Sequence, residues 1–515
     1  MKMLCAGVVM AVVVAAAAVG GAEELVAVGL QKQLLVDDYV IAERQHIKRV
    51  LGEPEKKGVV MQPSPDIPTD YHPDKPYPEW QWEVPHDFGY RTTVLWNERD
   101  EKFQMLYRAS AEDVTGYAES KDGIHWTKPL ISSAPNGRSN LIEYRGKTKG
   151  SFYEASFMID PRVPWGHPEK YKAAYNPGNT MCALAFSADG IQWEGYNRGR
   201  SVTGRAADYH NQILWDPIAH RYMLLTRTDL GAKGGRMEDR AARIMAHRKG
   251  NDLREHPRAW KTLVTVTVDD PKGEKTPEGV NVLQMESMTI WIYENVYFGL
   301  MHVLTMGEMT GALWDEVKVG EPDTRPETDV IDFYIGTSRD GVHFDKSWIH
   351  GGKPFIARGG DGEFDKAMVH SASEIVTRGD AHWLYYAGIY QEHHSGFSRK
   401  QSGKIGLATL PLDRFIAQRA EGRLGTITTK PFKLQGDTVQ VNVDAEGGRF
   451  YAEILDEQGK PFPGFAAEEA IHRDADELRL APRWKNHKDL SALQGKTIRL
   501  KFYLRNAKLY AFQIR

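Results

Sequence analysis

Three copies of one short phrase decide the fold: Ser120-Lys-Asp-Gly-Ile-His-Trp126, Ser187-Ala-Asp-Gly-Ile-Gln-Trp193 and Ser338-Arg-Asp-Gly-Val-His-Phe344. Each copy reads Ser-x-Asp-Gly-x-x-aromatic. Glycine accepts the positive φ of a tight turn, and aspartate can hydrogen-bond the backbone of that turn. The aromatic residue can anchor the turn in an apolar layer. A unit that recurs with one turn and one anchor indicates a repeat architecture.

The spacing of the copies predicts how many units there are. The first two start 67 residues apart (187 − 120) and the next two 151 apart (338 − 187). The second interval is about twice the first, so a degenerate unit is expected between them, and Ile244–Arg248 supplies it. A fifth related segment, Ile405–Phe415, follows the third copy. Five strand hairpins precede these five segments, which predicts an all-β fold with a five-bladed β-propeller.

The chain divides into four parts by this reading. We expect a signal peptide at 1–22, an N-terminal strand and rim segment at 23–84, the propeller catalytic domain at 85–424 and a small β-sandwich at 425–515. The rim segment holds one strand pattern at Leu34–Ile41 before a proline-rich stretch. The sandwich is predicted from three segments that alternate apolar and polar residues: Val439–Val443, Tyr451–Leu455 and Ile498–Leu504.

The N-terminus has the pattern of an export signal. A basic start at Lys2 precedes an apolar run from Leu4 to Val19, and small residues follow up to Ala22. The run is short for a transmembrane anchor. We therefore expect the mature chain to be secreted or periplasmic.

The composition limits which classes of binding partner and which covalent links are expected. The 515 residues carry a net charge of −3, which favours neither nucleic acid nor an anionic membrane as a partner. Removal of the leader would take Cys5 with it and leave Cys182, so no intramolecular disulfide is expected. Cys182 abuts the second turn phrase and is expected to be a buried structural thiol.

Polar residues gather where the inner strands are expected to begin. The innermost strand of each blade lines the central channel, and we align these strands on the residue before each hairpin turn: Trp96, Ile159, Trp215, Tyr293 and Thr377. Seven positions earlier stand Gly89, Phe152, Asp208, Glu286 and His370. Five positions earlier stand Arg91, Glu154, His210, Met288 and Ala372. Asp87 could reach the same rim. Strand starts normally favour apolar residues, so acids and histidines in register indicate a site.

Two other features bear on that site. Asp160-Pro161 imitates a catalytic pair, but Asp216-Pro217 occupies the same place in the next blade. Both fall in hairpin turns, where Asp-Pro has a structural use. An insert at 229–243 is rich in glycine and arginine, and such loops often shape the site of a propeller.

The repeat closures and the acids at strand starts resemble those of the five-bladed β-propeller glycoside hydrolases of families 32, 43, 68, 117 and 130. The likeness covers roughly residues 85–415. The N-terminal strand pattern and the C-terminal β-sandwich are similar to those of an exported bacterial branch of these proteins. The Asn-Asp-Pro-Asn-Gly start of family 32 enzymes is absent here. The fold also hosts phosphorylases and transferases, so it does not fix the reaction.

The resemblance implies catalytic roles by position. Acetal cleavage needs a proton on the leaving oxygen and stabilisation of an oxocarbenium-like transition state. Asp87 would be the base, Asp208 would orient the sugar and tune the acid, and Glu286 would be the acid. The residues expected to bind substrate are Arg91, Glu154, His210, His370, His394, Tyr90 and Trp165, with Glu154 the substitute acid. No cofactor and no catalytic metal are expected, although a structural central cation such as calcium could face His210 and His370.

Three functions remain open at this point. The first is an exported glycosidase that acts on a polysaccharide or a derived oligosaccharide, and a closed propeller pocket suits exo action. The second is a phosphorylase or transglycosidase, which would use Arg91, His210 and His370 to hold an anion. The third is a non-catalytic propeller that binds carbohydrate. The C-terminal sandwich is expected to brace the propeller.

Overall fold

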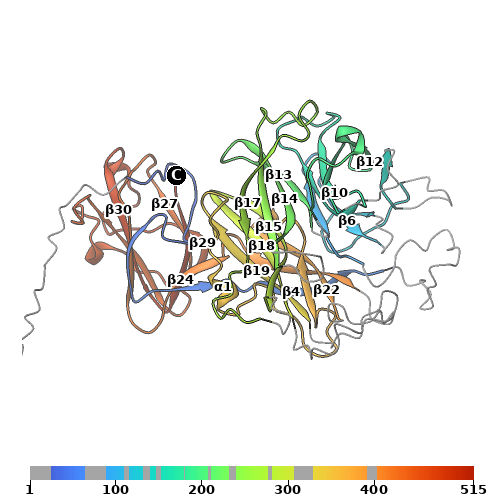
Figure 1. Cartoon of the computed structure of the whole chain (residues 1–515). Helices are drawn as coiled ribbons and strands as arrows, with labels where there is room; N and C mark the ends of the chain where they lie inside the picture. Colours follow the sequence, from blue (N-terminus) through green and yellow to red (C-terminus); the bar gives the residue numbers. More distant parts are fainter. Residues whose placement is uncertain are drawn as a thin grey trace, which may run out of the picture.

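The structure is a computed structural model in which two β-rich bodies lie side by side (Figure 1). It describes residues 25–63, 88–109, 115–131, 140–145, 152–178, 180–206, 210–230, 239–275, 281–306, 329–390 and 403–515. The expected signal peptide, Asp87, Asp208 and His394 lie outside these residues. Within them, one short α-helix occurs, α1 (Ser347–His350), and no helix is long and apolar enough to cross a membrane.

The larger body is a five-bladed propeller, as predicted. Blade 1 contains β5 (Thr93–Asn97), β6 (Lys102–Arg108) and β7 (Thr115–Ser120). Blade 2 contains β9 (Tyr153–Ile159), β10 (Tyr171–Asn176), β11 (Ala183–Ser187), β12 (Gln192–Gly195) and β8 (Glu143–Arg145). Blade 3 contains β13 (Gln212–Asp216), β14 (Arg221–Leu230), β15 (Asp239–His247) and β16 (Trp260–Val266).

The last two blades complete the ring. Blade 4 contains β17 (Leu283–Tyr293), β18 (Val296–Thr305) and β19 (Val330–Ser338). Blade 5 contains β20 (Met368–Ser371), β21 (Val376–Arg378), β22 (Ala381–Ile389), β23 (Lys404–Pro411) and β4 (Glu55–Met61). The inner strands contact one another in sequence, from β5 to β9, β13 and β17, and β21 contacts β5. The N-terminal strand β4 pairs antiparallel with β23 and is the outer strand of blade 5.

The repeated phrase forms the same turn in each copy. In the second copy, Ser187 Oγ accepts a hydrogen bond from Gly190 N at 2.9 Å and Asp189 Oδ1 accepts one from Gln192 N at 2.9 Å. Trp193 donates from its indole to Gly190 O at 3.0 Å and is fully buried. Gly190 has φ +79°, and a Cβ there would lie 3.2 Å from the ring of Tyr171. Glycine is therefore required both by the backbone and by the ring beneath it.

The Asp-Pro turns are structural, as predicted. Asp160 accepts a hydrogen bond from the hydroxyl of Tyr222 and lies 2.7 Å from Lys172 Nζ. Asp216 accepts from the hydroxyl of Tyr297 at 2.9 Å. In each case the tyrosine belongs to the following blade. The turn aspartate thus ties one blade to the next and is not available as a catalytic acid.

The smaller body is the predicted β-sandwich, and its two sheets enclose a core that includes Val441, Phe450 and Phe502. One sheet runs β29 (Asp476–Leu480), β27 (Val439–Asp444), β31 (Ala507–Ile514), β24 (Ile416–Ala420) and β3 (Lys48–Leu51), with β1 (Gln33–Leu34) also on β31. The other runs β2 (Ile41–Gln45), β25 (Gly425–Thr429), β30 (Thr497–Arg505) and β26 (Phe432–Lys433), with β28 (Arg449–Leu455) also on β30.

The N-terminal segment differs from its prediction. Strands β1, β2 and β3 pair with β31, β25 and β24, so they lie in the sandwich and not on the rim of the propeller. The expected single strand at Leu34–Ile41 is two short strands separated by bends. Strand β24 also lies in the sandwich, ahead of the boundary expected near Gly425. Local alternation of residues could not reveal pairing partners that lie hundreds of positions away.

The central channel is interrupted halfway along the inner strands. Thr93 Oγ1 and Ser373 Oγ lie 2.7 Å apart. Gln212 Nε2 donates to Ile290 O at 2.9 Å and to Ser373 O at 3.2 Å, while its Oε1 accepts from Ile290 N at 2.7 Å. We call Thr93, Gln212 and Ser373 the channel plug; all three are buried. The plug lies between the strand starts at one mouth of the channel and the strand ends at the other.

Candidate active site at the polar mouth

The starts of the inner strands bring together several of the residues predicted from the sequence. Arg91 precedes β5, His210 precedes β13, Glu286 lies near the start of β17 and His370 lies in β20. All four are buried. Four of the five blades therefore contribute a polar side chain at this end, which we call the polar mouth.

Arg91 occupies a strained position. Its φ is +57°, in the left-handed region that non-glycine residues rarely adopt. The preceding Gly89 also has positive φ, +81°, and a Cβ there would meet Ile405 Cγ1 at 2.7 Å. Left-handed strain in a non-glycine residue costs about 1–2 kcal/mol and clusters at functional sites. Here it turns the guanidinium of Arg91 toward blade 4.

Glu286 is held between two cations. Its Oε1 lies 3.5 Å from Arg91 Nη2, and its Oε2 accepts a hydrogen bond from Arg240 Nη1. The register of β17 and β18 shifts between Met285 and Ser287, which makes Glu286 the extra residue of a β-bulge. Bulges often re-aim a side chain next to an active site. Two neighbouring guanidinium groups favour the ionised carboxylate.

A second chain of hydrogen bonds holds the guanidinium of Arg91 through its other terminal nitrogen, Nη1. Arg91 Nη1 donates to Ser287 Oγ at 2.9 Å, and Ser287 Oγ lies 2.6 Å from His302 Nδ1. His302 Nε2 accepts from Ser371 N at 2.9 Å, so the ring proton belongs on Nδ1. Burial, and then the charge of Arg91, lower the pKa of His302 to about 3. The imidazole is therefore neutral and links blades 4 and 5.

The other imidazoles complete the mouth. Burial, followed by the charge of Arg91, lowers the pKa of His210 well below its ordinary value. The ring of His370 lies 4.4 Å from that of Tyr90 and 4.9 Å from that of His302, between centroids. Tyr90 also lies under the Arg91 guanidinium, 4.3 Å from its Cζ. Among the described residues, the mouth thus combines the carboxylate of Glu286, the guanidinium groups of Arg91 and Arg240, and several buried imidazole and phenol rings.

The predicted site residues fall into three groups. The first consists of those that the structure brings together: Glu286, Arg91, His210, His370 and Tyr90. The second consists of those that lie outside the described residues, Asp87, Asp208 and His394, together with Glu154, whose backbone lies in β9 and whose side chain is likewise not described. The third is Trp165, which lines a cavity at the opposite mouth and is not part of this site.

Three contributors were missed by the alignment of inner strands. Ser287 follows the bulge, His302 lies on the second strand of blade 4, and Arg240 lies on β15. The glycine- and arginine-rich insert at 229–243 was the signal for Arg240. Nothing in the sequence marks His302, because its role depends on pairing opposite Ser287 across β17 and β18.

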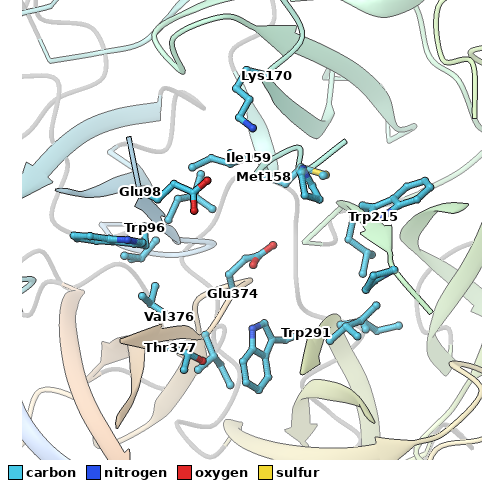
Figure 2. A pocket seen from close by; sticks show the side chains of 18 of the residues that line it. Trp96, Glu98, Met158, Ile159, Lys170, Trp215, Trp291, Glu374, Val376 and Thr377 are labelled. Carbon is cyan, nitrogen blue, oxygen red and sulfur yellow. The ribbon is translucent and has the colours of Figure 1, made fainter. Parts of the chain in front are cut away.

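The opposite mouth has a different character. A cavity of about 530 Å³ opens there, lined by the ends of β5, β9, β13 and β17 and by residues 374–377. Glu374 projects into the middle of it, among apolar and aromatic side chains (Figure 2). Burial raises the pKa of Glu374 to about 7. The residues that line this cavity include none of those described at the polar mouth.

Cys182 is fully buried, and burial raises the pKa of its thiol to about 12, so it is the structural thiol that was predicted. Among the described residues no group of three or more metal-ligating side chains is assembled. The groups that the described residues bring to the polar mouth are a carboxylate, guanidinium groups and imidazoles.

Comparisons with known proteins find solved structures that are similar in fold. No protein-family model and no curated protein matches the chain. Similar solved structures include an N-acetylgalactosamine deacetylase from F. plautii with blood group B trisaccharide, at 16% identity and TM-score 0.41, covering 70% of this chain and 96% of that one. An exo-inulinase from Aspergillus awamori has 12% identity, TM-score 0.37 and coverages of 86% and 99%. An endo-1,4-beta-xylanase from Bacteroides thetaiotaomicron has 8% identity, TM-score 0.40 and coverages of 63% and 90%.

Two of these three proteins are glycoside hydrolases, the kind that the sequence resemblance named. The identities and TM-scores are low, so the fold assignment rests on the strand pairing of the chain itself.

Proposed function

We propose that this chain is an exported glycoside hydrolase whose active site is the polar mouth of the propeller. The observation that carries the proposal is the buried carboxylate of Glu286, placed on a bulge between Arg91 and Arg240 at the mouth to which other blades bring the buried imidazoles of His210 and His370. Glycoside hydrolysis needs an ionised carboxylate to stabilise or attack the anomeric carbon and a second acid to protonate the leaving oxygen.

The surroundings of Glu286 favour the first of these roles. Its two guanidinium neighbours stabilise the negative charge, which suits a base, nucleophile or charge stabiliser and opposes the proton-donor role that its position implied. The proton donor would then come from Asp87, Asp208 or Glu154. Arg91 and Tyr90 would contact the sugar, and the closed ring would favour exo action on a polysaccharide or an oligosaccharide from it.

A phosphorylase or transglycosidase is the second candidate, because two arginines at one mouth suit a phosphate acceptor. Arg240 strengthens this candidate, since it adds a second guanidinium to the one predicted. Export argues for water as the acceptor, because phosphate is scarce outside the cell.

The test is product release from a panel of plant, algal and microbial glycans, in phosphate and in phosphate-free buffer. Free sugar from the wild type in both buffers, lost in Glu286→Gln, would support hydrolysis at this site. Sugar phosphate formed only with phosphate would favour the phosphorylase. Binding without product would favour a non-catalytic propeller, and release that survives Glu286→Gln would contradict the site.

A further inference from the structure

The cavity at the mouth opposite the proposed active site contains a carboxylate that the proposed function does not use. Glu374 lies in the connection between β20 and β21, and Figure 2 shows its side chain at the centre of the cavity. Among the described residues, no hydrogen bond or ion pair joins its carboxylate to another side chain. The residue is half-buried, and a carboxylate among apolar walls is stabilised by a cation or a hydrogen-bond donor beside it.

The walls and size of the cavity suit a small organic molecule. Its volume of about 530 Å³ lies in the range of ligand pockets, which are mostly apolar with a few polar groups that fix orientation. Apolar side chains such as Leu95, Met158, Leu214 and Ile292 supply the walls. These walls would contact an alkyl chain, while Glu374 supplies one negative charge in the middle.

The cations of this mouth are engaged elsewhere. Arg378 lies over the ring of Trp96 at 3.7 Å and Arg162 over that of Trp215 at 4.5 Å, measured from Cζ to the ring centroid. Lys170 Nζ donates to Val163 O at 2.9 Å and lies 4.5 Å from the ring of Trp165.

These contacts narrow the chemistry of the ligand. Several indole faces already carry a cation of the protein, so the cavity offers no open aromatic cage to a quaternary ammonium ion. An anionic ligand would be repelled by ionised Glu374. A cation that donates hydrogen bonds to a carboxylate and has an apolar body is the class that fits.

We propose that this cavity binds a primary aliphatic amine as its ammonium ion, with the nitrogen at Glu374 and the alkyl chain against the apolar walls. The proposal is independent of the glycosidase assignment, because the cavity and the proposed active site share no lining residue. The other charged groups at this mouth are Glu98 and Lys170, which line the cavity, and Arg99, Arg162 and Arg378, which lie over tryptophan rings around it.

The direction of the pH dependence follows from Glu374. The ammonium ion pairs with the ionised carboxylate, and burial raises the pKa of Glu374 to about 7. The affinity should therefore be constant between about pH 8 and about pH 9.5, where both groups are charged, and fall about tenfold for each pH unit below about 7.

Isothermal titration calorimetry with n-hexylammonium and with its uncharged analogue 1-hexanol, at about pH 8.5, tests the proposal. We expect n-hexylammonium to bind the wild type at least about tenfold more tightly than 1-hexanol does. Glu374→Gln keeps the shape of the side chain, and it should remove that difference without weakening 1-hexanol. Glu98→Gln, at an exposed position on the same cavity, is the matched control and should change the affinity by less than about twofold.

Three results would overturn the proposal. Equal binding of n-hexylammonium and 1-hexanol would show a cavity that accepts apolar molecules without regard to charge. Unchanged ammonium binding in Glu374→Gln would place the ligand elsewhere. Absence of binding by both compounds would show that the cavity has no such ligand. None of these results bears on glycan cleavage at the polar mouth.

Discussion

Among the described residues, Glu286 at the polar mouth and Glu374 at the opposite mouth are two carboxylates with opposite surroundings. Glu286 lies between Arg91 and Arg240, so its charge is compensated. Glu374 lies among apolar walls, and burial raises its pKa to about 7. The same channel thus stabilises a charge at one end and penalises it at the other.

This difference teaches how a site should be recognised. A carboxyl group with a raised pKa resembles a general acid. If the pKa were the only criterion, Glu374 would be assigned as a catalytic residue. Its cavity, however, offers few polar groups to hold sugar hydroxyls. The polar mouth offers guanidinium, imidazole and tyrosine groups from several blades, and this convergence of side chains supports the proposed site there.

The largest effect should come from removing the charge at the polar mouth. If the wild type cleaves a glycan, Glu286→Gln should lower the rate by about a thousandfold, as expected for loss of a catalytic carboxylate. Glu374→Gln is the matched change at the other mouth and should leave the rate within about twofold. Initial rates of sugar release measure both variants. Equal losses in the two would break the distinction between the mouths.

Replacing one arginine at each mouth should lower the free energy of unfolding of the protein by different amounts. Arg91→Met leaves Glu286 without one of its partners in a buried site, which should lower the free energy of unfolding by about 3 kcal/mol or more. Arg378→Met removes an exposed cation from the face of Trp96, at a cost of about 1 kcal/mol or less. Urea denaturation measures both variants, and similar costs would contradict the comparison.

The stability of the protein should depend on pH through Glu374. Its pKa is about 7 in the folded chain against an ordinary value of 4.5, so the folded state binds the proton more tightly. The stabilising effect of the protonated form is complete below about pH 4.5 and is lost as the pH rises through about 7. Glu374→Gln should therefore match the wild type at low pH and exceed its stability above about pH 8 by about 1–3 kcal/mol.

Urea denaturation of the wild type and Glu374→Gln across this pH range checks the expectation. A gain of equal size at low and high pH would show that packing, and not ionisation, distinguishes the two side chains.

The smallest effect should come from the plug that divides the mouths. Gln212→Leu strands the backbone N–H and C=O of Ile290, which should cost about 1–2 kcal/mol. Thr289→Val is the control, because the buried hydroxyl of Thr289 makes no hydrogen bond among the described residues. Thermal denaturation compares the two, and a larger loss in Thr289→Val would contradict the network described here.

Much of the propeller could be predicted because its determinants are local. The Ser-x-Asp-Gly phrase specifies a turn through contacts within a few residues, and the Asp-Pro turns repeat at equivalent places. Counting back from these turns located Arg91, His210, Glu286 and His370 at one mouth. These predictions needed only the period of the repeat and the length of a strand.

The parts that could not be predicted depend on pairing across long separations. The bulge at Glu286 changes the register of β17 by one residue, and only the partner strand reveals it. His302 acts through Ser287 and Ser371, which lie on other strands. Trp165 looked suited to stacking on a sugar, but its hairpin turn is at the far end of the channel from the strand starts.

The N-terminal strands also constrain the order in which the molecule can assemble. β1 pairs with β31 and β4 pairs with β23. These N-terminal strands therefore cannot pair until strands far along the chain have been synthesised. Contacts between distant segments close slowly because the intervening chain must first be ordered. Blade 5 cannot be completed before β23 is synthesised, and the sandwich cannot be completed before β31 is synthesised. The sandwich should therefore be completed only after synthesis, and removal of the final ten or so residues, which contain β31, should impair the sandwich first.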